Sequence, residues 1–176
     1  MCIIIDTNTF SSVFDKSSDT HNQFKPVLDW ILFGNGKAVY GGTKYNNELK
    51  KAKRYLKIFK ILKDARKTIY IDSAKVDEYE IGLKLKLQHR DFDDPHIIAI
   101  SSVSKCILIC SCDSRSYPFL KDQTLYPKNH AKPKIYKNSK NKNLLNDSNI
   151  PDIYKPSTKL NKKASENILI NLQNII

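Results

Sequence analysis

Residues 2–10 read CIIIDTNTF, and this short stretch carries the first evidence of the fold. An uninterrupted apolar run from Cys2 to Ile5 ends at Asp6, and the turn-forming sequence TNT follows. Apolar runs of this length between turn residues are typical of strands buried on both faces, as in parallel sheets covered by helices. We therefore expect a buried strand with a carboxylate at its carboxyl end. That carboxylate either caps the turn or takes part in chemistry.

Strand-like and helix-like segments alternate through the first part of the chain. Apolar residues at intervals of three or four predict one long helix over 43–65, and a shorter apolar helix is expected over 24–33. Ser73 is suited to cap a further helix, and Asp94 with Pro95 suits the N-cap and first position of another. The strands expected between these helices are 3–5, 37–40, 67–72 and 106–110. This alternation predicts an α/β fold on a parallel sheet.

The chain is strongly basic. Its 176 residues hold 30 Lys and Arg against 18 Asp and Glu, which gives a formal charge of +12. This balance favours a polyanionic partner, nucleic acid first and an anionic membrane surface second, although a general bias toward lysine gives the same count. No stretch approaches the ~18 consecutive apolar residues that a membrane span needs, so we expect a cytoplasmic protein. The four cysteines lack the spacing of a zinc site and are interpreted as reduced thiols.

The composition changes after residue 126. Residues 127–176 hold ten lysines against three acidic residues, and up to residue 160 they are rich in Lys, Asn, Ser and Pro with little periodicity. Such a composition is typical of an extended or disordered arm. Apolar residues return at helical spacing near the end, which predicts a terminal helix over 164–176. We therefore expect one domain over 1–126 and a basic C-terminal extension over 127–176.

Four carboxylates stand out by their positions. Asp6 and Asp113 follow apolar strands, Glu48 lies in the early turns of the expected long helix, and Asp94 precedes another helix. The carboxyl ends of parallel strands meet at one edge of a sheet, so these side chains are expected near one another. Like charges a few Å apart do not all stay ionised without a positive group between them. Oxygen ligands suit Mg²⁺ or Mn²⁺, and we expect one of these ions.

Four motifs in the same order as these carboxylates, IIIDTN, GGTKYNNEL, DDPHIIAIS and ILICSCD, resemble the PIN-domain nucleases over roughly residues 2–120. The resemblance implies a Rossmann-like three-layer α/β/α sandwich that binds Mg²⁺ or Mn²⁺ and hydrolyses RNA by means of an activated water. The residues at the positions of the family pattern are Asp6, Glu48, Asp94 with Ile97 and Ala99, and Asp113 with Ser111. The resemblance implies that Asp6, Glu48, Asp94 and Asp113 are catalytic and hold the metal.

Further roles follow for neighbouring residues. Asn8 and Ser111 are expected to support the metal ligands, and Asp93 is a rival of Asp94 for the ligand position. Basic residues are expected either to bind the phosphate backbone or to form a solvated face; they are Lys44, Lys50, Lys53, Arg54, Lys57 and Arg115. The family often has another acid just after its last aspartate, where this chain has Ser114 and Arg115. His89 and His96 are expected at the surface or as capping residues, because they lack zinc-binding spacing.

Two alternatives to an endoribonuclease stay open at this point. One is a PIN-like module that binds RNA or a protein partner without cleaving. The other is a phosphatase of the haloacid dehalogenase type, which requires a second aspartate where this chain has Asn8. Many PIN-type relatives are toxins neutralised by an antitoxin and others process RNA, so the resemblance implies RNA, an antitoxin or a second copy of the chain as partners.

Overall fold

Five parallel strands form the central sheet in the computed structural model, which describes residues 2–146, 154 and 159–175. They lie in the order β3-β2-β1-β4-β5. Every residue of β1 and β4 is buried, because these strands have neighbours on both sides and helices on both faces. The strands are β1 (Cys2–Ile5), β2 (Lys37–Gly41), β3 (Thr68–Ile71), β4 (Leu108–Cys110) and β5 (Lys134–Tyr136). The predicted α/β class with a parallel central sheet is confirmed.

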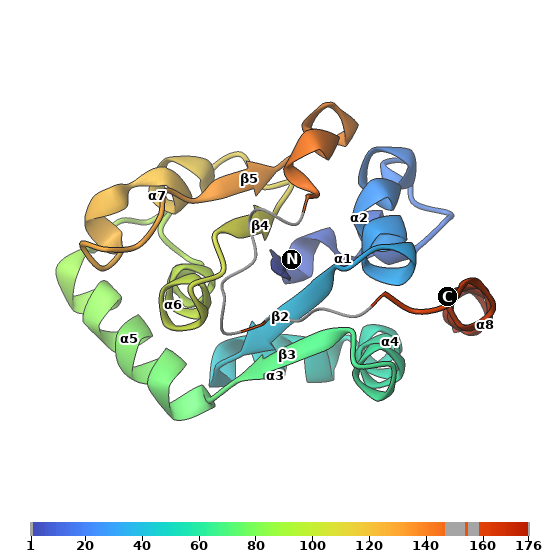
Figure 1. The fold of residues 1–176 in the computed structure, drawn as a ribbon. Helices are drawn as coiled ribbons and strands as arrows, with labels where there is room; N and C mark the ends of the chain where they lie inside the picture. Colours follow the sequence, from blue (N-terminus) through green and yellow to red (C-terminus); the bar gives the residue numbers. More distant parts are fainter. Residues whose placement is uncertain (1, 147–153, 155–158, 176) are drawn as a thin grey trace.

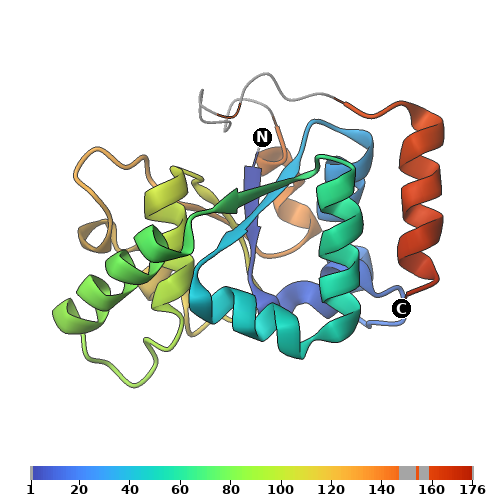
Figure 2. The ribbon, with the colours of Figure 1, turned by 90° about the horizontal axis from the view of Figure 1, so that it is seen from below.

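Helices cover both faces of this sheet. Figure 1 shows α5, α6 and α7 on one side and α1, α2, α4 and α8 on the other, and Figure 2 shows α3 beyond the end of the sheet. The helices are α1 (Phe10–Phe14), α2 (His21–Phe33), α3 (Thr43–Lys51), α4 (Lys53–Asp64), α5 (Ser73–Lys86), α6 (Pro95–Ser104), α7 (Tyr117–Lys121) and α8 (Lys162–Gln173). Short 3-10 turns are η1 (Thr7–Thr9), η2 (Gln123–Leu125) and η3 (Ser139–Leu144).

Helix α6 is enclosed between the sheet and α5. All of its residues are buried except Val103, which is partly exposed. Apolar residues fill its first half, and small serines allow close packing in the second. The hydroxyl of Ser101 donates to the carbonyl of Cys106 at 2.7 Å, whereas the buried hydroxyl of Ser102 has no hydrogen-bond partner among the described residues. Pro95 occupies the first turn, as predicted. The start of α6 is therefore held rigidly at the edge of the sheet.

Two local predictions are wrong. The helix expected over 43–65 is interrupted at Ala52, whose backbone leaves the helical region (φ −89°, ψ 66°) while its carbonyl accepts from Tyr55 and Leu56 to begin α4. The apolar periodicity continues across this break because α3 and α4 both bury one face against the same core. The N-cap of α5 is Asp72, whose side chain accepts from the amides of Ala74 and Lys75, and not Ser73.

The fold does not end at residue 126, where the sequence placed a domain boundary. Strand β5 pairs with β4 in parallel, with Lys134 opposite Leu108 and Tyr136 opposite Cys110. The ring of Tyr136 is fully buried, and its hydroxyl donates to the carbonyl of Gln23 at 3.0 Å. A three-residue strand that begins with lysine has no apolar run, so composition alone indicated an arm. Residues 147–153 and 155–158 of that expected arm lie outside the described residues.

The terminal helix α8 packs against α2 and α4. Its N-cap, Asn161, accepts from the amide of Ala164, and the hydroxyl of Ser165 donates to the carbonyl of Leu32 at 2.6 Å. The predicted helix over 164–176 thus corresponds to a helix that begins two residues earlier and ends at Gln173. Among the described residues, no helix combines the length and the apolar character needed to span a bilayer.

Lys67 is a buried cation at the start of β3. Its side chain is 1 % exposed, and its ammonium donates to the carbonyl of Gly34 at 2.8 Å. Burial, together with the charges of Lys37 and Lys159, lowers the pKa of Lys67 from 10.5 to about 8. The folded chain therefore releases a proton from Lys67 more readily than the unfolded chain does. The contribution of Lys67 to the free energy of unfolding therefore increases as the pH rises from 8 to 10.5.

We therefore expect the difference in unfolding free energy between the wild type and Lys67→Met to move in favour of the wild type as the pH rises. The expected movement between pH 7 and pH 10 is on the order of 1 kcal/mol. Urea denaturation at the two pH values measures it. The exposed Lys60→Met is the matched control and should show no such change. A difference that stays constant with pH would contradict a desolvated ammonium at position 67.

Candidate metal centre

The strand order places the switch point of the sheet at the carboxyl ends of β1 and β4. Chain connections lead from β1 toward β2 on one side and from β4 toward β5 on the other, and ligands of open α/β sheets bind where this direction changes. Asp6 follows β1, and its amide donates to the carbonyl of Cys110, the last residue of β4, at 2.9 Å. Ser111 and Asp113 follow directly. The segments that follow β1 and β4 therefore meet at the carboxyl edge of the sheet, which is where the sequence predicted the acidic side chains.

Asp6 is held firmly at this edge. Its carboxylate is 3 % exposed and accepts from the hydroxyl of Ser111 at 2.9 Å and from the amide of Asn8 at 3.2 Å. Burial is the main cause that raises the pKa of Asp6, and the Ser111 hydrogen bond opposes it. Asn8 contributes only its backbone amide among these contacts, because its side chain is exposed. The same carboxylate also caps η1, so the structural and chemical interpretations of Asp6 are compatible.

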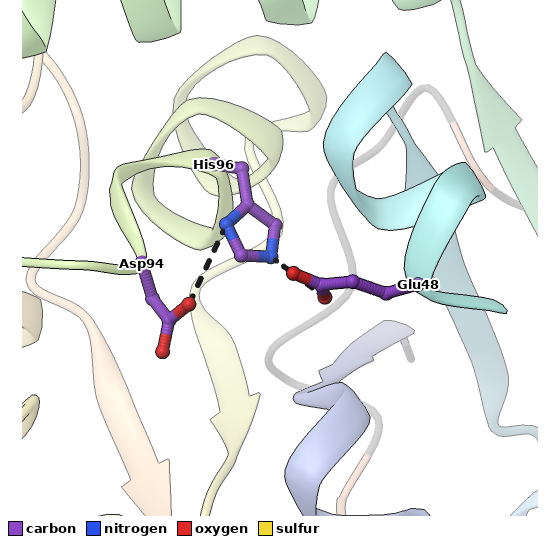
Figure 3. A group of neighbouring side chains, drawn as sticks. All are labelled: Glu48, Asp94 and His96. Atoms are coloured by element: carbon purple, nitrogen blue, oxygen red, sulfur yellow. Dashed lines mark ion pairs between the residues drawn. The ribbon is translucent and has the colours of Figure 1, made fainter. Parts of the chain in front are cut away.

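Glu48, Asp94 and His96 form the one group of three that could hold a metal ion among the described residues. Each offers a ligand atom, and these atoms lie within 4.8 Å of one another. Figure 3 shows the imidazole of His96 between the two carboxylates. Its Nε2 is 3.5 Å from Oε2 of Glu48, and its Nδ1 is 3.8 Å from Oδ1 of Asp94. Glu48 comes from α3, and the other two residues come from the start of α6.

His96 is the residue that the sequence placed wrongly. Its side chain is 1 % exposed, and neither ring nitrogen has a hydrogen-bond partner among the residues that the structure describes. The ring of Tyr45 packs edge-on against it with centroids 6.3 Å apart. His89 does lie at the surface, as expected. The position of His96 follows from the enclosure of α6, and the absence of Asp, Glu, Lys and Arg from residues 95–104 was the sequence feature that pointed to it.

Polar neighbours fix the two carboxylates of this group. The hydroxyl of Thr7 donates to Oε2 of Glu48 at 2.8 Å, a contact that sequence reasoning missed. Burial by itself raises the pKa of Glu48, but His96 and Thr7 outweigh it and the pKa is lowered. Asp94 occupies the N-cap position of α6 without capping it, so its carboxylate faces the group. The ammonium of Lys44 lies 3.3 Å from Oδ1 of Asp94 and also donates to the carbonyl of Asp93.

Asp113 lies outside the group of three. The guanidinium of Arg115 holds its carboxylate in two contacts, from Nε at 3.2 Å and from Nη2 at 3.0 Å. This hydrogen bonding lowers the pKa of Asp113 below its ordinary value. Its amide also donates to the hydroxyl of Ser111, which links Asp113 to Asp6. Of the four predicted ligands, Glu48 and Asp94 belong to the group, and Asp6 and Asp113 do not. Of the two neighbouring aspartates, Asp93 is exposed, and Asp94 is the one that belongs to the group.

The basic residues expected to bind nucleic acid are divided by the structure. Lys44 and Arg115 are engaged by acids of the site. Arg54 pairs with Asp15 at 3.3 Å and lies over the ring of Tyr55. The remaining three, Lys50, Lys53 and Lys57, are exposed on α3 and α4. A groove of about 500 Å³ between α3 and α5 is lined in part by Glu48 of the site, and its other charged lining residues are Lys44, Lys51, Lys84, Asp77 and Glu80.

The donor set suits a divalent cation. It combines carboxylate oxygens with an imidazole whose buried nitrogens have no hydrogen-bond partner in the described residues, and an ion would satisfy the carboxylates and one of these nitrogens. No family model, curated protein or solved structure matches the chain. The site is therefore characterised by its own geometry: two carboxylates and one histidine, flanked by Asp6, at the carboxyl edge of a parallel sheet.

Metal binding to this group should stabilise the fold. Saturating MnCl₂, at roughly 100 times the dissociation constant, is expected to raise the melting temperature by about 5 °C, because the ion binds only the folded arrangement. Differential scanning calorimetry with and without EDTA measures the shift. Asp94→Asn should remove most of it, whereas Asp29→Asn, which alters a partly exposed acid on α2 outside the group, should retain it. An equal shift in wild type and Asp94→Asn would place the bound ion elsewhere.

Proposed function

We propose that the protein is a metal-dependent endoribonuclease of the PIN type, which hydrolyses phosphodiester bonds of RNA. The observation that supports this proposal most directly is the gathering of Glu48, Asp94 and His96 beside Asp6 at the switch point of a parallel sheet. These residues come from three separate segments of the chain: the end of β1, helix α3 and the start of α6. The PIN assignment itself rests on the four sequence motifs.

Each residue has a role in this proposal. Glu48 and Asp94 hold Mg²⁺ or Mn²⁺, and Thr7 fixes the orientation of the Glu48 carboxylate. A divalent cation at this position supplies Lewis-acid activation of water and neutralises charge on the phosphodiester. Asp6, fixed by Ser111 and buried, adds negative charge at the same edge. Lys44 lies next to Asp94 and lines the groove beside Glu48, where its ammonium can also bind a substrate phosphate.

RNA is the proposed substrate because the chain is strongly basic and because a groove with lysines in its lining lies beside Glu48. The chain carries a formal charge of +12, and the groove is lined by Lys44, Lys51 and Lys84 as well as by the acids Glu48, Asp77 and Glu80, of which Glu80 pairs with Lys84. Cations in such a groove bind the phosphate backbone without reading the base sequence. A role as a toxin neutralised by an antitoxin, or in RNA processing, belongs to the same proposal through the PIN resemblance.

A non-cleaving binding module is the second candidate. The observation that favours it is that side chains already neutralise two of the predicted acids: Arg115 pairs with Asp113 and Lys44 with Asp94. A site in this state could bind RNA through its groove without assembling a metal centre. The haloacid dehalogenase-type phosphatase has weaker support, because Asn8 offers neither an acid nor a base at the required position.

Cleavage assays distinguish these candidates. Wild-type protein with MnCl₂ or MgCl₂ should cleave RNA, EDTA should abolish cleavage, and Asp94→Asn or Glu48→Gln should lower the rate by at least about 100-fold, because each removes a metal ligand. The control variant Asp29→Asn should cleave at the wild-type rate. Cleavage that survives EDTA would refute the mechanism. Tight RNA binding without cleavage would favour the binding module, and turnover of a small phosphomonoester would favour the phosphatase.

Salt dependence tests the groove independently of cleavage. In EDTA, where no cleavage is expected, the RNA affinity of the wild type should fall steeply between about 50 and 200 mM salt. The double variant Lys51→Ala/Lys84→Ala should reduce the slope of log affinity against log salt by about 1.4, which is about 0.7 for each lost phosphate contact on a single strand. Fluorescence anisotropy measures both. Lys162→Ala/Lys163→Ala on α8 is the matched control, and equal slopes for the two double variants would exclude the groove as the binding surface.

A further inference from the structure

We propose that His96 is itself a ligand of the metal centre, and that its imidazole makes the site select a first-row transition-metal ion such as Mn²⁺ over Mg²⁺. This inference deepens the proposed function, because it names the class of ion that the same site takes. It rests on the placement of the imidazole and not on the PIN pattern, whose positions in the motif DDPHIIAIS are Asp94, Ile97 and Ala99 and not His96.

The burial of His96 needs an explanation. A buried ring nitrogen without a hydrogen bond costs the folded state its lost hydration, and such atoms are rare in native proteins. Both nitrogens of His96 are in this condition among the described residues, and the side chain is 1 % exposed. The surrounding elements do not supply the missing partner: the ring of Tyr45 contacts the imidazole edge-on, and the Tyr45 hydroxyl donates instead to the carbonyl of Ile5.

The nitrogens are aimed at the acids of the site. Figure 3 shows Nε2 directed toward Glu48 and Nδ1 toward Asp94, at 3.5 Å and 3.8 Å from the nearest carboxylate oxygens. These separations are too long for good hydrogen bonds. They are compatible with donors that share an ion, since all three ligand atoms fall within 4.8 Å of one another. The ring lies between the two carboxylates, and one of its two nitrogens can join them as the third ligand of a shared ion.

The presence of nitrogen decides the class of ion. Mg²⁺ takes oxygen ligands and gives up its water shell reluctantly, so an imidazole adds little to its affinity. First-row transition-metal ions accept imidazole nitrogen as well as carboxylate oxygen, and Mn²⁺ is the one among them that also suits oxygen-rich sites. The two carboxylates of the group offer limited negative charge, because Asp94 shares its charge with Lys44. An ion that gains from nitrogen is thus favoured over one that relies on oxygen and charge.

In a competing account, His96 opposes cation binding at this group. In that account the ring is a positively charged partner that lies between Glu48 and Asp94 and takes the place of a metal ion. Removal of His96 would then free two carboxylates and strengthen cation binding. In the ligand account, removal of His96 takes away a donor and weakens binding of Mn²⁺. The sign of the change in Mn²⁺ affinity therefore separates the two accounts.

The test uses the full chain freed of metal with EDTA and titrated with Mn²⁺ by electron paramagnetic resonance, with Mg²⁺ as competitor. His96→Gln should weaken Mn²⁺ binding by at least about tenfold and weaken Mg²⁺ binding less, so the preference for Mn²⁺ shrinks. His89→Gln, which alters an exposed histidine of the same chain, should match the wild type in both affinities. Circular dichroism establishes that each variant is folded.

A second measurement needs no variant. Electron spin echo modulation of the Mn²⁺-loaded wild type should show coupling to an imidazole ¹⁴N, and the same modulation should persist in His89→Gln. Absence of that coupling, or unchanged or stronger Mn²⁺ binding in His96→Gln, would overturn the inference. RNA cleavage is not among these readouts. Imidazole-coupled Mn²⁺ in a protein that cleaves no RNA would therefore refute the nuclease and leave the metal assignment intact.

Discussion

The parallel pairing of β1 with β4 is the constraint on which the site depends. Ile5 lies opposite Cys110, and the amide of Asp6 continues the ladder by donating to the Cys110 carbonyl at 2.9 Å. This register brings the Ser111 hydroxyl within 2.9 Å of the Asp6 carboxylate, although 105 positions separate them in sequence. A shift of one residue would turn alternate side chains to the other face and separate the two. All four residues of β1 are apolar and buried, so the hydrogen bonds of Asp6 to Cys110 and Ser111 are what distinguish this register.

The strands and most helices of the core were predictable from local sequence. Continuous apolar runs between turn residues identified β1 and β4, and helical spacing with a proline start identified α6. Strand β5 was not predictable in this way, because Lys134–Tyr136 becomes a strand only when the outer edge of β4 offers it hydrogen bonds. The interruption at Ala52 was also hidden, since the same apolar face continues on both sides of it. In both cases the tertiary environment, and not local preference, determines the conformation.

The site was predictable in its location and less so in its pairings. Strand ends and a helix start were enough to bring Asp6, Glu48 and Asp94 to one edge. The basic partners of these acids were not predictable. Arg115 reaches back two residues to Asp113, whereas Lys44 meets Asp94 across 50 positions of the sequence. Histidine 96 was assigned to the surface for want of a spacing motif. Its burial depends on α5 covering α6, which is a property of the assembled layers.

The placement of β5 also bears on how the chain folds during synthesis. All three residues of β4 are fully buried, and β5 is what covers their outer hydrogen-bonding edge. A nascent chain that has reached only residue 126 presents this apolar edge to solvent, where it can pair with another copy. The loop that carries Ser111 and Asp113 begins at the same strand, so its anchor is incomplete until residue 136 has been added. Both the covering of the β4 edge and the assembly of the acidic edge therefore come late in translation.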